Sequence, residues 1–457
     1  MNRYDISVAE FLQQSHSGNI DYNDFIINYL DALKEASKKL RLMQCINEKT
    51  IRTSSELYGL PITVKDNICT AGLQSSAGSK ILSGYVPPFD ATAVARLKDA
   101  GGFIAGKTNM DEFGHGTFAV HSAYGIPKNP HDPERSCGGS SGGAAGVVAA
   151  VPFPQIALCE STGGSISCPA AFCNVAGLTP TYGLVSRYGL IDYANSMDKI
   201  GFIAKEVRDI ALGLSIIAGY DKRDSTSLNV AQKQYHAEPN LKGVRIAVPK
   251  EYFENLDESV ENSVWDAIKL LESNGASYQE VSLPTTKYAL AAYYIIATSE
   301  TSTNLAKMCG MRYGLHKPLE GNFNQYFSSV RTEGFGEEAK RRIILGTFAR
   351  MSGYREQYYM KAMRVRTLIT NDFKRIFAKH DVIAAPTMPT TAPRFNEIEK
   401  LTPLQNYQMD VLTVPPNLSG IPMISLPCGD MVGLHLLGDH LHEEKIIGVA
   451  AAYEGLR

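Results

Sequence analysis

The sequence has little that would place it in a membrane, outside the cell or directly on nucleic acid. It contains no run of about 18 apolar residues, so no membrane-spanning helix is predicted. Its N-terminus is polar and lacks the apolar centre of a signal peptide. The 45 lysines and arginines are balanced by 47 aspartates and glutamates, which excludes a whole-chain basic field for gripping nucleic acid.

The cysteines also form no recognisable functional pattern, because the eight are scattered and include no CxxC pair. They are Cys45, Cys69, Cys137, Cys159, Cys168, Cys173, Cys309 and Cys428. This spacing argues against both a disulfide framework and a zinc site. We expect buried free thiols in a protein of the reducing cytoplasm, and no metal site in this chain.

What the sequence does contain is a rhythm of strands and helices. Residues 60–64 and 103–105 are short apolar segments typical of buried strands, and an amphipathic helix is predicted over 90–100 between them. Further strands are expected at 244–248 and 381–387, and further helices within 7–40, 257–275 and 336–379. This pattern predicts an α/β fold with a mixed or parallel sheet covered by helices.

The length of 457 residues fits either several ordinary domains or one unusually large α/β domain. We predict a helical segment over 1–55 that packs on a single domain formed by 56–457. A polar stretch at 222–244 marks a softer subdivision of that domain. Residues 138–181 are rich in Gly, Ser and Ala, but apolar residues interrupt them. We interpret this stretch as loops packed tightly inside the core.

Residues 101–108 match the phosphate-binding pattern GxxxxGK[ST] letter for letter. A nucleotide-binding P-loop needs a strand before it and a helix after it. Here a helix is expected before it, and Phe103, Ile104 and Ala105 in its middle favour a buried strand. We therefore reject a nucleotide site and interpret Lys107 as a structural or site-lining residue.

Three segments carry residues suited to acyl-transfer chemistry. Lys65 follows an apolar strand, where desolvation would depress its pKa enough for it to act as a base at neutral pH. The run GGSSGG at 138–143 offers hydroxyls on a tight backbone, and TGGS at 162–165 can place a serine beneath free backbone N–H groups. Each feature alone is weak, because surface lysines and flexible glycine loops are common.

In this order along the chain, Lys65-Asp66-Asn67, GGSSGG and TGGSI resemble the amidase signature family. The resemblance implies an amidase-signature fold, with a large central mixed β-sheet covered by helices on both faces. It also implies a Ser–Ser–Lys triad, in which neutral Lys65 takes a proton from Ser140 and Ser140 takes one from the nucleophile Ser165. The backbone N–H groups of Thr162, Gly163, Gly164 and Ser165 would form the oxyanion hole.

Segments beyond the triad resemble one branch of the family, the A subunits of glutamyl-tRNA(Gln) amidotransferases. These segments are 106–113, 179–191, 195–201, 222–227, 334–348 and 386–390. The resemblance implies a glutaminase that holds free glutamine with Tyr293, Arg342 and Asp410. Arg342 would meet the carboxylate of glutamine and Asp410 its ammonium group.

The same resemblance implies a heterotrimer with B and C subunits. The ammonia released from glutamine would convert Glu-tRNA(Gln) to Gln-tRNA(Gln) on the B subunit, which takes up the charged tRNA and uses ATP and Mg²⁺. The chain itself would need no cofactor. Its near-neutral net charge of −2 agrees with the absence of a tRNA-binding role of its own.

The sequence departs from the family pattern around the nucleophile. The family usually reads G-x-D-T-G-G-S-I-R, whereas Ser161 and Ser167 stand here in place of the aspartate and the arginine. One extra residue separates Ser140 from Ser165, and Ala144 stands where serine is common. If the two charges pair in the family, losing both avoids stranding one of them in the core. We therefore expect Ser161→Asp alone to harm folding or activity, and the double change with Ser167→Arg to be tolerated.

Two other interpretations remain open. A stand-alone amidase acting on another small amide would turn over its substrate without a partner. An impaired paralogue or a non-catalytic structural chain is also compatible with Ser161 and Ser167, and would form no acyl-enzyme at Ser165.

Overall fold

The computed structural model describes residues 3–50 and 54–457. At its centre is an 11-stranded sheet with the order β1-β3-β2-β4-β6-β5-β10-β11-β9-β7-β8. The strands are β1 (Met43–Ile46), β2 (Pro61–Lys65), β3 (Phe103–Thr108), β4 (Ile156–Ser161), β5 (Ala176–Thr179), β6 (Lys199–Ala204), β7 (Arg245–Pro249), β8 (Ser277–Val281), β9 (Val382–Pro386), β10 (Met423–Gly429) and β11 (Val432–Leu437). Strand β2 is parallel to β3 and β4, and β7 is parallel to β8 and β9. The other neighbouring pairs are antiparallel, so the predicted mixed sheet is confirmed.

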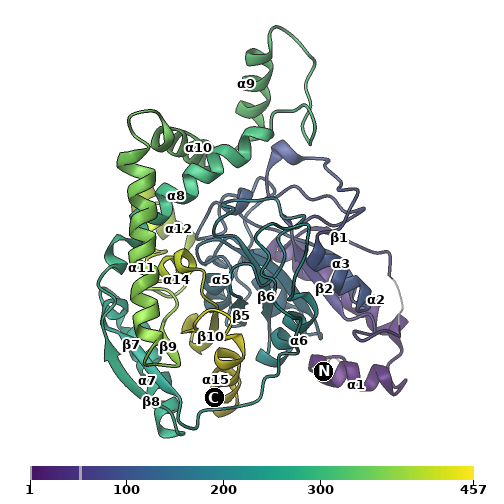
Figure 1. Ribbon diagram of the computed structural model, residues 1–457. Helices are drawn as coiled ribbons and strands as arrows, with labels where there is room; N and C mark the ends of the chain where they lie inside the picture. The colour runs from purple at the N-terminus through teal and green to yellow at the C-terminus, as the bar shows by residue number, and fades with distance from the viewer. Residues whose placement is uncertain (1–2, 51–53) are drawn as a thin grey trace.

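Helices cover this sheet, as the alternating sequence pattern predicts. They are α1 (Val8–His16), α2 (Tyr22–Leu40), α3 (Thr92–Asp99), α4 (Gly142–Ala150), α5 (Ser167–Phe172), α6 (Val207–Ile217), α7 (Glu258–Ser273), α8 (Ala289–Asn304), α9 (Phe323–Gly334), α10 (Glu337–Arg350), α11 (Lys361–Phe377), α12 (Phe395–Ile398), α13 (Pro403–Gln408), α14 (Val414–Ser419) and α15 (Glu443–Leu456). Short turns of helix are η1 (Lys80–Leu82), η2 (Glu112–Gly114), η3 (Lys250–Phe253), η4 (Thr286–Tyr288), η5 (Leu305–Lys307) and η6 (Glu356–Met360). In Figure 1, α2 and α3 lie beside the first strands, and α8 and α11 lie at the opposite side of the molecule.

The two N-terminal helices, within the predicted helical range 7–40, begin at capping side chains. The Ser7 hydroxyl accepts the backbone N–H of Glu10, and the Glu10 carboxylate accepts the backbone N–H of Ser7. The Asp21 carboxylate accepts two backbone N–H groups at the start of α2. Strand β1 was not predicted, because its four residues are too few for a periodic pattern to stand out.

The interpretation of residues 138–181 as loops is wrong in part. The stretch is buried as expected, but it contains α4, β4, α5 and β5. Its glycines serve close packing: a Cβ on Gly143 would lie 2.4 Å from the carbonyl oxygen of Asn109. Burial against neighbouring backbone therefore outweighs the low helix and strand propensity of Gly and Ser here.

The rejection of a P-loop is confirmed, because Phe103–Thr108 forms the buried strand β3. Lys107 is fully buried in this strand. Its ammonium group donates to the Ser75 hydroxyl at 3.0 Å and to the carbonyl oxygen of Ile68. Lys107 therefore has a structural role.

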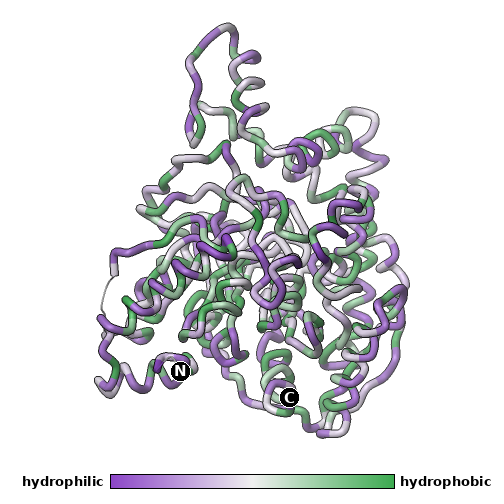
Figure 2. Tube along the Cα trace, turned by 180° about the vertical axis from the view of Figure 1, so that it is seen from behind, coloured by the Kyte–Doolittle hydropathy of each residue, from purple (hydrophilic) through white to green (hydrophobic). Residues whose placement is uncertain are grey.

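The stretch 222–244 connects α6 to β7, and strands from both sides of it belong to the one sheet. The division into 1–55 and 56–457 stays a prediction. An arm that carries α9 projects away from the body of the molecule in Figure 1, and Figure 2 shows it from behind. Within residues 3–50 and 54–457, no helix is long and apolar enough to cross a membrane.

The residues of the candidate site lie at one end of the central strands. Strands β2 and β4 are parallel, so their carboxyl ends lie side by side, and the antiparallel strand β6 begins there. In the register of β4 and β6, Ser161 lies opposite Lys199. Lys65, Glu160 and Asp198 stand at or beside these strand ends and are therefore brought together.

Candidate active site

Lys65 lies at the end of β2 and is fully buried. Its Nζ is 2.7 Å from Oγ of Ser140, 2.8 Å from the carbonyl oxygen of Glu160 and 2.9 Å from Oε2 of the same glutamate. The structure thus joins Lys65 to Ser140 across 75 positions of sequence, as the family resemblance implies. It also adds a buried contact between Lys65 and the carboxyl group of Glu160 that the sequence pattern did not indicate.

Ser165 lies in the short turn between β4 and α5. The backbone N–H of Ser141 donates to the carbonyl oxygen of Ser165 at 3.3 Å, which holds the two glycine-rich segments side by side. A Cβ on Gly163 would lie 2.3 Å from the hydroxyl oxygen of Tyr293, so only glycine fits there. Gly164 has a φ of +144°, a conformation that favours glycine.

A pocket opens in front of this turn. It is lined by Gly114, Gly116, Gly139, Gly163, Gly164, Ser165, Tyr293, Arg342 and Asp410. The nucleophile candidate therefore faces the same space as the three residues predicted to hold the substrate, although these lie more than a hundred positions away in the sequence. Ser140 and Lys65 lie behind the pocket wall and are fully buried.

The Arg342 guanidinium is held rigidly in the wall of this pocket. Its Nε donates to Oε1 of Glu338 at 2.7 Å, and its Nη1 donates to the hydroxyl of Tyr193. The rings of Tyr193, Tyr294 and Tyr407 surround it, with Cζ of Arg342 within 5.5 Å of each centroid. Carboxylate and π faces together stabilise this nearly buried cation, which can offer its remaining N–H groups to an anion.

Asp410 provides the opposite charge. Its Oδ1 accepts the hydroxyl of Thr117 at 2.9 Å, and its Oδ2 accepts the hydroxyl of Tyr294 at 2.6 Å. Burial raises the pKa of Asp410 to about 6, and these hydrogen bonds oppose the rise. The carboxylate is therefore ionised at neutral pH and becomes protonated in mildly acidic solution.

The two serines that replace charged family residues both have neutral partners. The Ser161 hydroxyl accepts the backbone N–H of Gly164 at 3.3 Å. The Ser167 hydroxyl lies 3.2 Å from Nε2 of His435, a histidine whose pKa burial lowers to about 3.

Lys199, opposite Ser161 in the sheet, is buried, and its Nζ has no hydrogen-bond partner among the described residues. Burial and the positive charge of Arg366 lower the pKa of Lys199 to about 7.

Sequence reasoning missed two carboxyl groups beside the relay. The Thr162 hydroxyl oxygen lies 2.8 Å from Oε1 of Glu160 and 2.7 Å from Oδ1 of Asp198. Asp198 lies in the segment 195–201 and Glu160 just before the TGGSI run, yet 38 positions separate them (198 − 160). A carboxylate at a strand end is the only local signal, and pairing of β4 with β6 is needed to join them.

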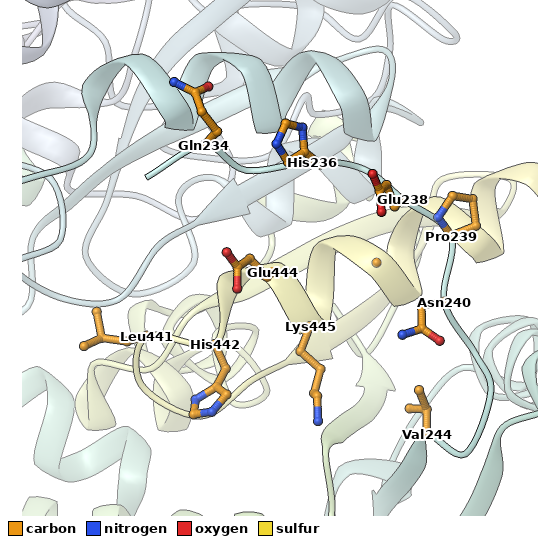
Figure 3. A pocket seen from close by; sticks show the side chains of 11 residues that line it. Gln234, His236, Glu238, Pro239, Asn240, Val244, Leu441, His442, Glu444 and Lys445 are labelled. Carbon is orange, nitrogen blue, oxygen red and sulfur yellow. The ribbon is translucent and has the colours of Figure 1, made fainter. Parts of the chain in front are cut away.

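A wider cavity of about 580 Å³ lies elsewhere, between α15 and the segment 234–244 (Figure 3). In Figure 3, Glu444 and Lys445 approach it from α15 and His442 from the loop before that helix, while His236 and Glu238 lie along the facing segment. None of its lining residues belongs to the relay or to the substrate pocket. Its mixed charges do not single out a reaction, so the smaller pocket at Ser165 is the candidate active site.

The cysteines take no part in this site. All eight are free, and Cys69, Cys137, Cys159, Cys168 and Cys173 are buried. The prediction of buried free thiols is confirmed for these five, whereas the other three are partly exposed. Among the described residues, no group of three or more His, Cys, Asp or Glu side chains could hold a metal ion.

A buried amine that contacts a serine hydroxyl, next to a second serine in a glycine turn, is typical of an amide hydrolase in which lysine takes the place of histidine. The family model for amidases matches residues 7–447, and the chain belongs to this amidase family.

Individual proteins are similar to this chain over most of its length. The A subunit of the glutamyl-tRNA(Gln) amidotransferase of Methanococcoides burtonii is 53% identical over 404 residues, which cover 87% of this chain and 84% of that protein. The protein of the same name from Methanosarcina mazei is 48% identical, over 93% and 92% of the two chains. The crystal structure of its counterpart from Thermotoga maritima matches with a TM-score of 0.85 and 36% identity, over 99% and 95%. The peptide amidase of Stenotrophomonas maltophilia matches with a TM-score of 0.81 and 27% identity, over 98% and 96%.

The unpaired Lys199 predicts a dependence of stability on pH. Its pKa is about 7 in the folded chain against an ordinary value of 10.5, so the unfolded chain binds the extra proton between these pH values. The contribution of Lys199 to the free energy of unfolding is therefore fully present above pH 10.5. It is lost as the pH falls towards 7. We expect Lys199→Met to raise the free energy of unfolding by roughly 2–4 kcal/mol at pH 6 and much less at pH 10.

Urea unfolding at both pH values measures this difference. Lys205→Met, a change at an exposed lysine just after the same strand, serves as the control and should show no such pH dependence. An equal gain for Lys199→Met at pH 6 and pH 10 would contradict the prediction.

Lys199 also changes what we expect of Ser161→Asp. Residues directly opposite on antiparallel strands point to the same face, so an aspartate at position 161 would meet the Lys199 amine. The single change is now expected to be tolerated. Combined with Lys199→Met it should cost about 3–5 kcal/mol, because the new carboxylate is left buried without a partner. A double-mutant cycle by urea unfolding measures the coupling, and additive effects would rule it out.

Proposed function

We propose that this chain is the glutamine-hydrolysing A subunit of a glutamyl-tRNA(Gln) amidotransferase. The observation that carries this proposal is the meeting of Ser165 with Tyr293, Arg342 and Asp410 in the lining of one pocket. Relatives of this name, 53% and 48% identical over most of the chain, support it.

The proposed reaction begins with proton transfer away from the pocket. Neutral Lys65 accepts the proton of Ser140, and Ser140 accepts the proton of Ser165 as its Oγ attacks the side-chain amide carbon of glutamine. Backbone N–H groups of the turn 162–165 hold the oxygen of the tetrahedral intermediate. The proton returns through Ser140 to the departing nitrogen, which leaves as ammonia. Water then cleaves the acyl-enzyme, and glutamate is released.

The proposed substrate fits the charges of the pocket. Free glutamine carries an α-carboxylate and an α-ammonium group at one end and the scissile amide at the other. The guanidinium of Arg342 suits the carboxylate, because its planar fork can donate two parallel hydrogen bonds. The carboxylate of Asp410 suits the ammonium group, and the Tyr293 hydroxyl lies beside Gly163 at the reacting end.

We further propose that the ammonia passes to a B subunit, which activates the tRNA-linked carboxylate with ATP and Mg²⁺, and that a C subunit joins the two. The names of the relatives, which designate one subunit of a larger enzyme, support an assembly of this kind. The net charge of −2 fits a chain that leaves tRNA binding to its partner. Free, mostly buried cysteines support a cytoplasmic location.

Ser165→Ala should abolish ammonia release from glutamine, with a loss of at least about 10³-fold in kcat, because the covalent step has no other nucleophile. Mass spectrometry of the wild type mixed with glutamine and quenched should find the acyl group on Ser165. Ser167→Ala removes a hydroxyl close to the same turn and should retain activity. An acylated residue other than Ser165 would overturn the assignment.

Dependence on partners separates the proposed amidotransferase component from a stand-alone amidase. Glutaminase activity that rises when B and C subunits and charged tRNA are added supports the amidotransferase. Full turnover of simple amides without partners supports a stand-alone amidase. The peptide amidase of Stenotrophomonas maltophilia has the same fold as this chain.

Asp410 predicts how glutamine binding depends on pH. Because its pKa is about 6 and only the carboxylate attracts an ammonium group, KM for glutamine should rise about tenfold per pH unit below 6. Asp410→Asn should raise KM at every pH and remove that slope. Asp430→Asn, at an exposed position, is the control and should keep both KM and the slope. A slope that survives in Asp410→Asn would assign it to another group.

A further inference from the structure

The Thr162 side chain connects two buried carboxyl groups in a way that requires an extra proton. Its hydroxyl oxygen lies within hydrogen-bond distance of Oε1 of Glu160 and of Oδ1 of Asp198, at 2.8 and 2.7 Å. A hydroxyl has one hydrogen to donate, and an ionised carboxylate can only accept. One of the two contacts must therefore be a donation from a protonated carboxyl group to the threonine oxygen.

Each carboxyl group also has donors suited to its ionised form. Backbone N–H groups of Tyr193 and Ala194 donate to Asp198 at 2.9 and 3.0 Å. On the other side, Lys65 and the amide of Asn67 approach Oε2 of Glu160 at 2.9 and 3.0 Å. Both carboxyl groups are fully buried, so neither exchanges its proton with water directly. The negative charge thus has two supported positions, joined by one hydroxyl.

Lys65 fits its surroundings both with and without the proton that it takes up. As a neutral amine, it donates its two N–H groups to the carbonyl oxygen and to Oε2 of Glu160, and its lone pair accepts the hydroxyl of Ser140. As an ammonium group, it donates to the same three oxygens, at 2.7, 2.8 and 2.9 Å. The two states differ in how much negative charge they require at Glu160.

We propose that Glu160, Thr162 and Asp198 form a proton switch behind the Lys65–Ser140 relay, which moves negative charge towards Lys65 as that lysine becomes protonated. While Lys65 is neutral, the Glu160 carboxyl O–H donates to Thr162, and the Thr162 hydroxyl donates to the Asp198 carboxylate. When Lys65 receives the proton of Ser140, Glu160 passes its proton to the Thr162 oxygen. Thr162 in turn passes its own proton to Oδ1 of Asp198.

The switch leaves an ion pair between Lys65 and Glu160 and a neutral Asp198, with no proton gained or lost by the carboxyl pair. When the proton of Lys65 returns through Ser140 to the departing ammonia, the switch reverses. Glu160, Thr162 and Asp198 act through Lys65 and do not touch the substrate, so they are positioning residues. The proposal rests on the proposed hydrolysis of an amide by this relay.

The surrounding charges are compatible with a retained proton. Burial and the charge of Glu160 raise the pKa of Asp198 well above its usual value, and Arg187 opposes this rise. The other titratable groups that face the three residues and Lys65 are Asp111, Cys159 and Lys199. Burial lowers the pKa of Lys199 to about 7, so this amine is mostly neutral at pH 8. The Cys159 thiol is neutral because burial raises its pKa to about 12.

Infrared difference spectroscopy tests the shared proton without any need for activity. At pH 8, subtracting the spectrum of Asp198→Asn or Glu160→Gln from that of the wild type should reveal one protonated carboxylic acid present only in the wild type. Other buried acids cancel in the difference. The two variants are independent comparisons, so either one suffices if the other fails to fold. Two ionised carboxylates in the wild type would overturn the proposal.

The pH profile of ammonia release tests the coupling to Lys65. Glu160→Gln removes the anion beside Lys65, so the acidic limb of kcat should move to lower pH. Thr162→Val removes the proton path and leaves Glu160 ionised, so the limb should move to higher pH. Each shift should be at least about one pH unit, as expected for a charge within hydrogen-bond distance. Loss of packing alone would not produce shifts of opposite sign.

Thr162→Ser retains a hydroxyl at the same position and should recover the wild-type limb. Thr387→Val makes the same chemical change at another buried threonine and should leave the limb in place. Unmoved limbs, or shifts in the same direction in Glu160→Gln and Thr162→Val, would overturn the switch. A wild type that shows the infrared band but releases no ammonia would instead contradict the proposed function.

Discussion

The burial of the Lys65 amine at the end of β2 is the constraint on which the site depends. An amine without water must find every partner within the protein, since an unpaired buried charge costs several kcal/mol. Ser140 and two oxygens of Glu160 supply those partners. They can do so because β2 and β4 are parallel neighbours, which places Lys65 and Glu160 at the same edge of the sheet. The contacts of Lys65 with Ser140 and Glu160 are thus a consequence of strand order as much as of residue type.

Close packing of glycine loops accounts for the other half of the site. A side chain on Gly163 would overlap Tyr293, and one on Gly139 would overlap Asp111. Backbone N–H groups can therefore approach a substrate oxygen closely, and the walls of the pocket can be formed by helices from distant parts of the chain. Tyr293 comes from α8 and Arg342 from α10, two helices that pack on each other. This packing places Tyr293 and Arg342 in the lining of the same pocket as Ser165.

Much of the architecture could be predicted from local pattern. The apolar segments before Lys65 and around Phe103 form strands, and two helices lie within the range 7–40 where helix is predicted. The glycine-rich stretch was harder, because Gly and Ser favour loops by propensity, whereas burial made α4 and β4 of it. The effect expected for Ser161→Asp also differs from the one that the sequence predicts, since local sequence does not reveal that Lys199 lies opposite Ser161.

The family-like order of Lys65, Ser140 and Ser165 and the glycines around them can be recognised without a structure, because they depend on residue type and spacing. The strand–helix alternation can be recognised in the same way, because periodicity is local. The contacts of Thr162 with Glu160 and Asp198 beside Lys65, and the lack of a partner for Lys199 among the described residues, appear only in the folded chain. Those facts follow from which strands pair and in which register, and a protonation state depends on distances and burial that no stretch of sequence contains.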